Sequence, residues 1–379
     1  MQKLVKYALA VLIVLLLLTI LSALSSLKTQ ITPPTVIKNI NLGASDGLPS
    51  LSELAIVPNG KYIYATYDRF ATVAVIATSN NTLVNTINVG EPDKTFPKGI
   101  AVSSNGLYVY VAESGSNTIS VISSNNDKII SNISVNDAPW WVAVTPDGKY
   151  LYAAGTSDVS VISTSNNTVL NNINISTANK ITFSLDGKDA YFANCANNNG
   201  SVWIVSNPKN TVTDLINNVG DCPFGVTMNP NGKFLYVTTE DNITIIGTAN
   251  NSVLDKIRLG SLPSGIAISP DGNYLYVATT TGISIISTSN NSVVYSISGV
   301  GSPEDVAVMP NGTDVYVSYE YPSNFTPGIV VLSAPTKYTN FVSLQYTIAI
   351  IVIIISIILL VLYDGLSKKR IIKTETDVS

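Results

Sequence analysis

The sequence contains no histidine, and this absence removes several kinds of active site. Histidine is the commonest general base near neutral pH, the central member of Ser-His-Asp triads and a ligand in most catalytic zinc sites. The phosphate-binding patterns G-x-x-x-x-G-K-[ST] and strand–G-x-G-x-x-G–helix are missing as well. We therefore expect no metal and no cofactor, and we favour a protein that is not an enzyme, with a hydrolase that works with loop carboxylates as the open alternative.

Cysteine is equally scarce, because Cys195 and Cys222 are the only two. Two cysteines without histidine cannot complete the usual four-ligand zinc site. An isolated pair outside the cytoplasm is typical of a disulfide, and two buried thiols are the alternative. We expect a disulfide.

Charge is sparse and slightly acidic. Charged residues make up 12% of the chain, and 25 acidic residues face 21 basic ones for a formal net charge of −4. A chain without a basic excess is a poor partner for nucleic acid or anionic lipid. Nucleic acid is therefore excluded as an expected partner.

Two apolar segments flank the rest of the sequence. The first runs over residues 7–24 behind Lys3 and Lys6, which fits either a signal peptide or a retained anchor. The second runs over residues 341–363 and is followed by a basic cluster at 368–370. An apolar run of this length spans a bilayer, and the basic cluster belongs on the cytoplasmic side.

These segments divide the chain into four parts. We expect a signal peptide or N-terminal membrane anchor over 1–27 and one repeat domain over 33–335. A transmembrane helix over 341–363 and a short cytoplasmic tail over 364–379 follow. This arrangement predicts an integral membrane protein with its repeat domain outside the cell.

The repeat domain contains seven copies of one sequence motif. Each copy has an apolar alternating run, an Asx-Gly turn and a second run that contains tyrosine, as in the segment from Pro263 to Val277. Asx-Gly tolerates the positive φ that tight hairpins require. The turn glycines recur every 39 to 46 residues, at Gly60, Gly106, Gly148, Gly187, Gly232, Gly272 and Gly312. Strand signals at this period predict an all-β, seven-bladed β-propeller with four antiparallel strands, A to D, in each blade.

The second run resembles the repeat of the YVTN-type β-propeller family. Tyr236-Val237-Thr238-Thr239 is the nearest copy, and Tyr276-Val277-Ala278 is a variant. The resemblance covers about four-fifths of the chain. It implies a prokaryotic, and specifically archaeal, cell-surface propeller, and it implies no single activity.

The seventh copy lacks its fourth strand, and the missing strand is found at the other end of the domain. Residues 35–43 match the D-strand pattern of residues 82–90. We expect this first strand to complete the last blade and to close the ring. Both connections to the membrane would then leave from the face with the A–B and C–D turns, and the B–C and D–A loops would point outward.

Ten Asn-x-Ser/Thr sequons occur, which in an external protein are glycan acceptors. Asparagine is also favoured in tight turns, so turn chemistry explains part of this number. The sequons are at Asn80, Asn132, Asn166, Asn174, Asn199, Asn242, Asn250, Asn290, Asn311 and Asn324.

The outward loops collect acidic residues and the pair Trp140-Trp141. A ring of carboxylates could bind a cation or a cationic ligand, although solvated loop acids are the plainer explanation. An exposed tryptophan could form a platform for a ligand, although core packing is the commoner role. The candidate ligand-binding residues are Asp68, Glu113, Asp137, Trp140, Asp221, Glu240 and Glu304.

The sequence therefore predicts a membrane-anchored, extracellular β-propeller that binds a protein or glycan ligand in the cell envelope. An extracellular hydrolase or lyase that uses acidic loop residues is the first alternative. A structural component of a surface coat is the second.

Overall fold

The computed structural model describes residues 29–42, 51–195, 200–207, 209–320 and 327–339, together with residues 14, 353–355 and 357. The chain divides into two compact units. The larger unit is Pro34–Ala334, and the other combines Met1–Pro33 with Pro335–Ser379. In the second unit, β1 (Thr29–Thr32) pairs antiparallel with β30 (Thr336–Thr339).

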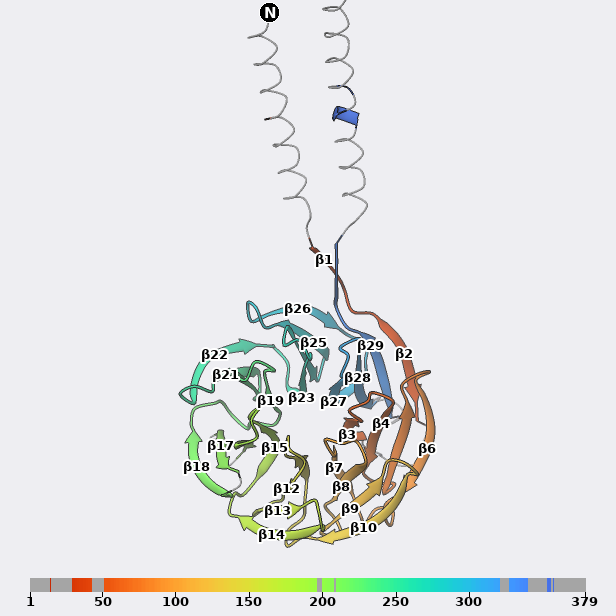
Figure 1. The fold of residues 1–379 in the computed structure, drawn as a ribbon, viewed down its shortest axis with the longest axis vertical. Coiled ribbons are helices and arrows are strands. Elements are labelled where there is room, and N and C mark those ends of the chain that lie inside the picture. The colour runs from red at the N-terminus through yellow and green to blue at the C-terminus, as the bar shows by residue number, and fades with distance from the viewer. Residues whose placement is uncertain are drawn as a thin grey trace, which may run out of the picture. The chain divides into compact units, whose positions relative to one another are not determined.

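The larger unit is a seven-bladed β-propeller, as the repeats predict. Seven four-stranded antiparallel sheets surround a centre, with the first strand of each sheet innermost (Figure 1). The strands of each blade are given from the innermost to the outermost, first for blades 1 to 3. Blade 1 contains β3 (Leu51–Ile56), β4 (Tyr62–Tyr67), β5 (Thr72–Ala77) and β6 (Thr82–Asn88). Blade 2 contains β7 (Pro97–Val102), β8 (Tyr108–Glu113), β9 (Thr118–Ser123) and β10 (Lys128–Ser134). Blade 3 contains β11 (Trp141–Val144), β12 (Tyr150–Ala154), β13 (Val159–Ser163) and β14 (Thr168–Ile173).

The remaining blades follow the same order. Blade 4 contains β15 (Ala178–Phe183), β16 (Asp189–Asn194), β17 (Ser201–Ser206) and β18 (Thr211–Ile216). Blade 5 contains β19 (Val226–Met228), β20 (Phe234–Thr238), β21 (Asn242–Gly247) and β22 (Ser252–Arg258). Blade 6 contains β23 (Pro263–Ile268), β24 (Tyr274–Thr279), β25 (Gly282–Ser287) and β26 (Ser292–Ile297). Blade 7 contains β27 (Ser302–Val308), β28 (Asp314–Glu320), β29 (Gly328–Ser333) and β2 (Val36–Asn41).

Blade 7 is completed by the first strand of the unit, so the predicted ring closure is confirmed. Strand β2 pairs antiparallel with β29, from Val36 opposite Leu332 to Asn41 opposite Gly328. The N–H of Ala334 donates to the carbonyl of Thr313, which lies in the A–B turn of blade 7. The chain therefore enters and leaves Pro34–Ala334 on the face that carries the A–B turns.

The turns have the backbone conformations that their residues favour. All seven A–B turn glycines have φ between 68° and 73°, a region that costs a residue with a Cβ atom free energy. Six C–D turns place Asn or Asp at φ between 51° and 56°, including Asn81, Asp127 and Asn291. These two residue types tolerate the left-handed region better than other side chains do.

A buried tyrosine lies four residues after each turn glycine, and in three blades its hydroxyl links to the neighbouring blade. The hydroxyl of Tyr316 in blade 7 donates to Asn81 Oδ1 of blade 1 at 2.6 Å. Tyr64 and Tyr152 make the corresponding bonds, at 2.8 and 2.6 Å, to Asp127 and Asn210 of the next blade. In blades 1, 3 and 7 this tyrosine therefore joins the core of one blade to the C–D turn of its neighbour.

The predicted terminal segments 1–27, 341–363 and 364–379 lie almost wholly outside the described residues. The positions described there, residues 14, 353–355 and 357, are helical. A search of the described residues alone finds no helix whose length and apolar character would let it cross a membrane.

The interblade tyrosine bond predicts a measurable difference between two conservative substitutions. We expect Y316F to lower the free energy of unfolding by about 0.5–1.5 kcal/mol, because a buried hydrogen bond across the ring closure is lost. Y276F is the matched control, since the Tyr276 hydroxyl is buried without a partner among the described residues. Urea unfolding of the purified full chain measures both. Equal losses in the two variants would contradict a linking role for the hydroxyl.

Candidate ligand-binding mouth of the channel

The residues that surround the centre of the ring occupy two equivalent positions in each blade, seven and eight residues before the turn glycine. The residues seven positions before it are Glu53, Gly99, Trp141, Lys180, Gly225, Gly265 and Asp305. The residues eight positions before it are Ser52, Lys98, Trp140, Asn179, Phe224, Ser264 and Glu304. All fourteen lie at the start of an inner strand or next to it, on the face opposite the A–B turns.

Glycine at the first of these positions allows neighbouring inner strands to approach closely. A Cβ atom on Gly99 would lie 2.7 Å from the carbonyl oxygen of Trp140, and one on Gly265 would lie 2.6 Å from the Cα of Asp305. Four blades carry a large or charged residue instead. Three of those four residues meet in the middle of the ring.

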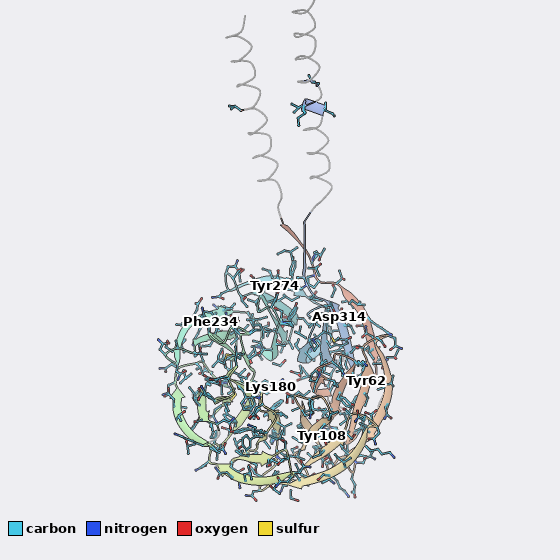
Figure 2. All side chains as sticks on the ribbon, viewed as in Figure 1. Tyr62, Tyr108, Lys180, Phe234, Tyr274 and Asp314 are labelled. Atoms are coloured by element: carbon cyan, nitrogen blue, oxygen red, sulfur yellow. A yellow bond between two sulfur atoms is a disulfide. The ribbon has the colours of Figure 1, made fainter. Side chains whose placement is uncertain are left out.

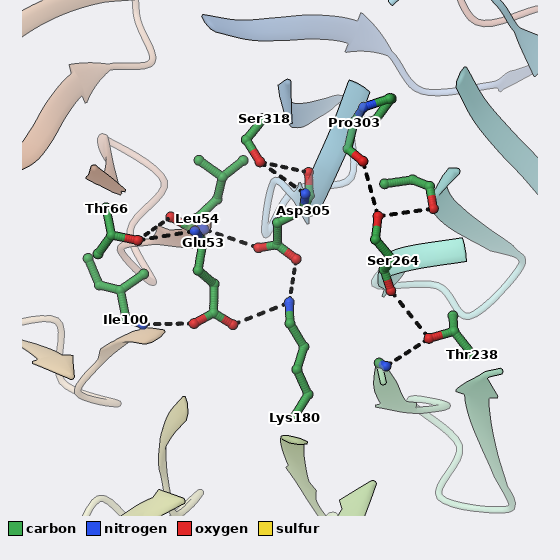
Figure 3. A network of polar contacts seen from close by, with 12 residues as sticks. Glu53, Leu54, Thr66, Ile100, Lys180, Thr238, Ser264, Pro303, Asp305 and Ser318 are labelled. Atoms are coloured by element: carbon green, nitrogen blue, oxygen red, sulfur yellow. Dashed lines mark hydrogen bonds and ion pairs between the residues drawn. The ribbon is translucent and has the colours of Figure 1, made fainter. Parts of the chain in front are cut away.

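Lys180 crosses the channel to reach two carboxylates. It lies near the centre of the ring (Figure 2), and its ammonium pairs with Asp305 Oδ1 and, at 3.2 Å, with Glu53 Oε1 (Figure 3). The lysine belongs to blade 4, and the acids belong to blades 7 and 1. The side chains are 14%, 4% and 13% exposed, so the cluster is shielded from water.

Each carboxylate also binds the backbone of the following blade. Asp305 Oδ2 accepts from the N–H of Leu54 at 3.0 Å, and Glu53 Oε2 accepts from the N–H of Ile100 at 2.8 Å. Hydroxyl groups add similar links, since Thr66 donates to the carbonyl of Lys98 at 2.6 Å. The cluster therefore holds blades 7, 1 and 2 together while it reaches blade 4.

The cluster has one lysine for two carboxylates, and this imbalance sets its protonation. Burial acts to lower the pKa of Lys180, but Asp305 and Glu53 together raise it, so the lysine stays charged. Burial raises the pKa of Glu53 to about 7 in spite of Lys180, and the negative charge of Asp305 adds to the rise. Asp305 is the main counter-ion of Lys180, whereas burial keeps the pKa of Glu53 above its usual range.

A cavity of about 190 Å³ lies at this inner ring. Trp140 is 42% exposed, whereas Trp141 is 8% exposed and packs edge-on against Phe224 with ring centroids 5.3 Å apart. The ammonium groups of Lys98 and Lys180 lie 5.6 and 5.4 Å from the ring centroids of Trp140 and Trp141, respectively. The cavity is lined by Ser52, Lys98, Trp140, Trp141, Asn179, Lys180, Phe224 and Glu304. We call this cavity the mouth.

Two polar groups of the mouth lack a protein partner among the described residues, the hydroxyl of Ser52 and the carboxylate of Glu304, and Glu304 is the one that carries charge. Lys98 is engaged by Asp68 at 2.8 Å, but Glu304 has neither a hydrogen bond nor an ion pair within the described part of the chain. Burial raises the pKa of Glu304 to about 7, and Glu320, Asp305 and Asp68 add to the rise while Lys98 opposes it. Its carboxylate is therefore the part of the mouth most in need of a counter-ion.

The structure brings together three of the seven predicted ligand-binding residues. Trp140 and Glu304 line the mouth, and Asp68 adjoins it through Lys98. Asp221 and Glu240 are exposed at blade 5, where the N–H of Glu240 donates to the carbonyl of Asp221. They are not part of the mouth.

Glu113 and Asp137 are used by their own loops. Glu113 is buried and accepts hydrogen bonds from three hydroxyls around the B–C turn of blade 2, those of Ser116, Thr118 and Ser120. Asp137 accepts from Thr156, Ser157 and Ala138. Partial burial acts to raise the pKa of Asp137, but these hydrogen bonds lower it overall. Both acids stabilise turns.

Cys195 and Cys222 form a disulfide with their Cα atoms 4.3 Å apart. The bond joins the end of β16 to the loop before β19. Among the described residues, no three acidic or cysteine side chains converge closely enough to hold a metal ion.

Four sequons occupy one repeated place, the first asparagine of a C–D turn. Asn80, Asn166, Asn250 and Asn290 are all exposed. In each of them the Ser or Thr hydroxyl donates to the asparagine Oδ1 at 2.8–2.9 Å. Asn132, Asn174 and Asn311 are exposed elsewhere, Asn242 is half-buried, and Asn199 and Asn324 lie outside the described residues.

Sequence reasoning missed Glu53 and Lys180, the two residues that join Asp305 in the centre. A signal for them exists in the repeats. Three of the seven copies have glycine seven positions before the turn, and a charged residue in that place has a side chain that must enter the channel. Comparison of the copies position by position would have found both.

Comparison with known proteins supports the architecture. Residues 21–129 match the family model described as Lactonase, 7-bladed beta-propeller. The structure is similar to a solved chain of Kuenenia stuttgartiensis hydrazine synthase, with a TM-score of 0.65, 20% sequence identity and coverage of 79% of this chain and 97% of that one. A search of curated proteins gave no match. At this identity the likeness concerns the fold, and the chain is a β-propeller protein.

The cluster at the centre predicts a large and pH-dependent effect of K180M. At pH 8 we expect a loss of about 3–5 kcal/mol in the free energy of unfolding, because two buried carboxylates lose their counter-ion. The loss should be smaller at pH 5.5, where Glu53, whose pKa is raised to about 7, is protonated in the folded chain. Chemical unfolding of the purified full chain at both pH values measures the effect.

K188M is the control, since Lys188 pairs with Asp186 in the same blade but is fully exposed. It should leave stability unchanged at both pH values. A K180M variant as stable as K188M at pH 8 would contradict the proposed electrostatics of the centre.

Proposed function

We propose that this chain is a membrane-anchored, externally displayed propeller that binds a protein or glycan ligand at the mouth of its channel. The observation that carries the proposal is the composition of the mouth. It combines the half-open indole of Trp140 with the unpartnered carboxylate of Glu304. Tryptophan and carboxylate side chains supply contact area and orientation to a bound group.

The other charges of the mouth are already neutralised, which favours binding over catalysis. Lys98 is paired with Asp68, and Lys180 is paired with Asp305 and Glu53. A charged lysine in an ion pair is neither a nucleophile nor a base. The mouth is therefore equipped to hold a group rather than to transform it.

Features of the sequence and of the topology support a position of the mouth outside the cell, facing away from the membrane. The apolar segments 7–24 and 341–363 supply the proposed anchors, and the disulfide fits an oxidising compartment. Both ends of Pro34–Ala334 leave on the face with the A–B turns, so the mouth lies on the opposite face. The YVTN-type resemblance adds an expectation of a prokaryotic, archaeal cell surface, with exposed sequons as glycan acceptors.

A lactone hydrolase is the second candidate. Two observations favour it: the lactonase family model over residues 21–129 and the raised pKa of Glu304, about 7. A carboxyl group with such a pKa can accept a proton from water as a general base near neutral pH. The hydrolase needs a further group to stabilise the developing oxyanion, and both lysines of the mouth are engaged.

Substitutions in the mouth should abolish ligand capture. We expect E304Q and W140A to lose most of the signal that the wild type gives on arrays of glycans and peptides, because the contact face or the charge is removed. E240Q makes the same chemical change as E304Q at an exposed place in blade 5 and should keep the wild-type signal.

Two results would contradict the proposed binding site. One is an array signal that survives in both W140A and E304Q. The other is turnover of a lactone by the wild type that E304Q abolishes, which would establish the hydrolase instead.

The membrane orientation predicts which lysines are reachable from outside. A membrane-impermeant amine reagent applied to intact cells should modify Lys149 and Lys188, whose side chains are 72% and 77% exposed. It should spare Lys368 and Lys369, which follow the proposed transmembrane helix. Peptide mass mapping reads both sets. Labelling of Lys368 and Lys369 without Lys149 and Lys188 would reverse the orientation.

A further inference from the structure

The surroundings of the mouth carry more negative than positive charge. Five carboxylates lie in and around it, and two lysines face them. The acids are Glu53, Asp68, Glu304, Asp305 and Glu320, and the bases are Lys98 and Lys180. Since low-dielectric walls strengthen the field of such a group, the mouth attracts a cation and repels an anion.

The indole of Trp140 already contacts one cation of the protein, the ammonium of Lys98. The ammonium of Lys98 is 5.6 Å from its centroid, within the range of a cation–π contact. The same arrangement recurs one residue further on, with the Lys180 ammonium 5.4 Å from the Trp141 ring. Because Trp140 remains 42% exposed, part of its ring is open to a ligand.

Glu304 supplies the charge that these lysines leave unbalanced. Both lysines are committed to other carboxylates, and Glu304 has no partner among the described residues. A charged carboxylate that is partly removed from water is stabilised when a cation takes the place of the lost water molecules. A ligand cation at this point would fill that place.

The volume of the mouth limits how much of a ligand can enter. Pockets for whole small molecules are commonly about 300–1,000 Å³. A cavity of about 190 Å³ holds one end group, and the remainder of the ligand would extend over the outward face.

We propose that the mouth binds the ammonium-bearing end group of a ligand between the indole of Trp140 and the carboxylate of Glu304. The inference rests on the proposed binding function and names the chemical class of its ligand. It separates this class from neutral and anionic end groups, which the excess of acids disfavours.

Binding should depend on pH through Glu304. The charged groups that face it are Glu320, Asp305, Asp68 and Lys98. With its pKa raised to about 7, Glu304 is ionised above pH 8 and becomes neutral as the pH falls through 7. An ammonium group therefore binds best on the alkaline side and is released on the acidic side.

Tryptophan fluorescence of the purified full chain tests the proposal. Two of the three tryptophans are in the mouth, and the W203F background removes the third. The probes are Nα-acetyl-lysine N-methylamide and its norleucine and glutamate counterparts. We expect saturable quenching at pH 8 with the lysine probe, and a tenfold or greater weakening in E304Q, since a charge-assisted contact is lost. Quenching should weaken similarly at pH 5.5 in the wild type, and E240Q should behave as the wild type does.

A second variant tests the same inference in the opposite direction. D68N/K98M removes the resident ammonium from the Trp140 ring and keeps the net charge of the mouth, so the lysine probe should bind more tightly. Weaker binding of the lysine probe to this variant would overturn the inference.

The remaining outcomes separate the ligand class from the site. Equal quenching by the norleucine probe, or preferred quenching by the glutamate probe, would overturn the ammonium class and leave the mouth as a binding site. Absence of quenching by every probe, together with an array signal that survives in W140A, would overturn both.

Discussion

The structure depends on one buried ionic interaction, the contact of Lys180 with Asp305 and Glu53 across the channel. Neighbouring blades are joined by packing and, in three places, by a tyrosine hydroxyl, whereas blade 4 reaches blades 7 and 1 through Lys180 at the centre. The charges are removed from water and stabilise the ring only because each carboxylate has a lysine on one side and a backbone N–H on the other. The same lysine, Lys180, also lines the mouth.

Ion pairs at the centre of the ring determine which charged groups of the mouth remain available to a ligand. Lys180 and Asp305 cancel one another, and Lys98 and Asp68 do the same. What is left is an aromatic face and the carboxylate of Glu304, whose raised pKa, about 7, reflects burial among other acids. These two groups suit the proposed cationic end group, because one supplies charge and the other supplies contact area.

The repeats predict the fold well because turns and strands depend on residues that are close together in the sequence of each copy. The Asx-Gly turns and the alternating runs predict seven blades, and the strand before the first blade predicts the closure. The site is harder to predict, because partners such as Lys180 and Asp305 are 125 residues apart and meet only in the closed ring. Loop acids look alike in sequence, although Glu113 and Asp137 are satisfied within their own turns while Glu304 is not.

The most direct test of the account is an infrared difference titration of the carboxyl groups in wild type and E304Q, with and without an ammonium probe. The account predicts two carboxyl groups with a pKa raised to about 7 in the wild type, those of Glu53 and Glu304, and loss of the second in E304Q, so the difference between wild type and E304Q reports the titration of Glu304. Addition of tetramethylammonium should shift this titration to lower pH, since a bound cation favours the charged form. A wild-type signal that is identical to that of E304Q, or that the cation leaves unmoved, would contradict the account.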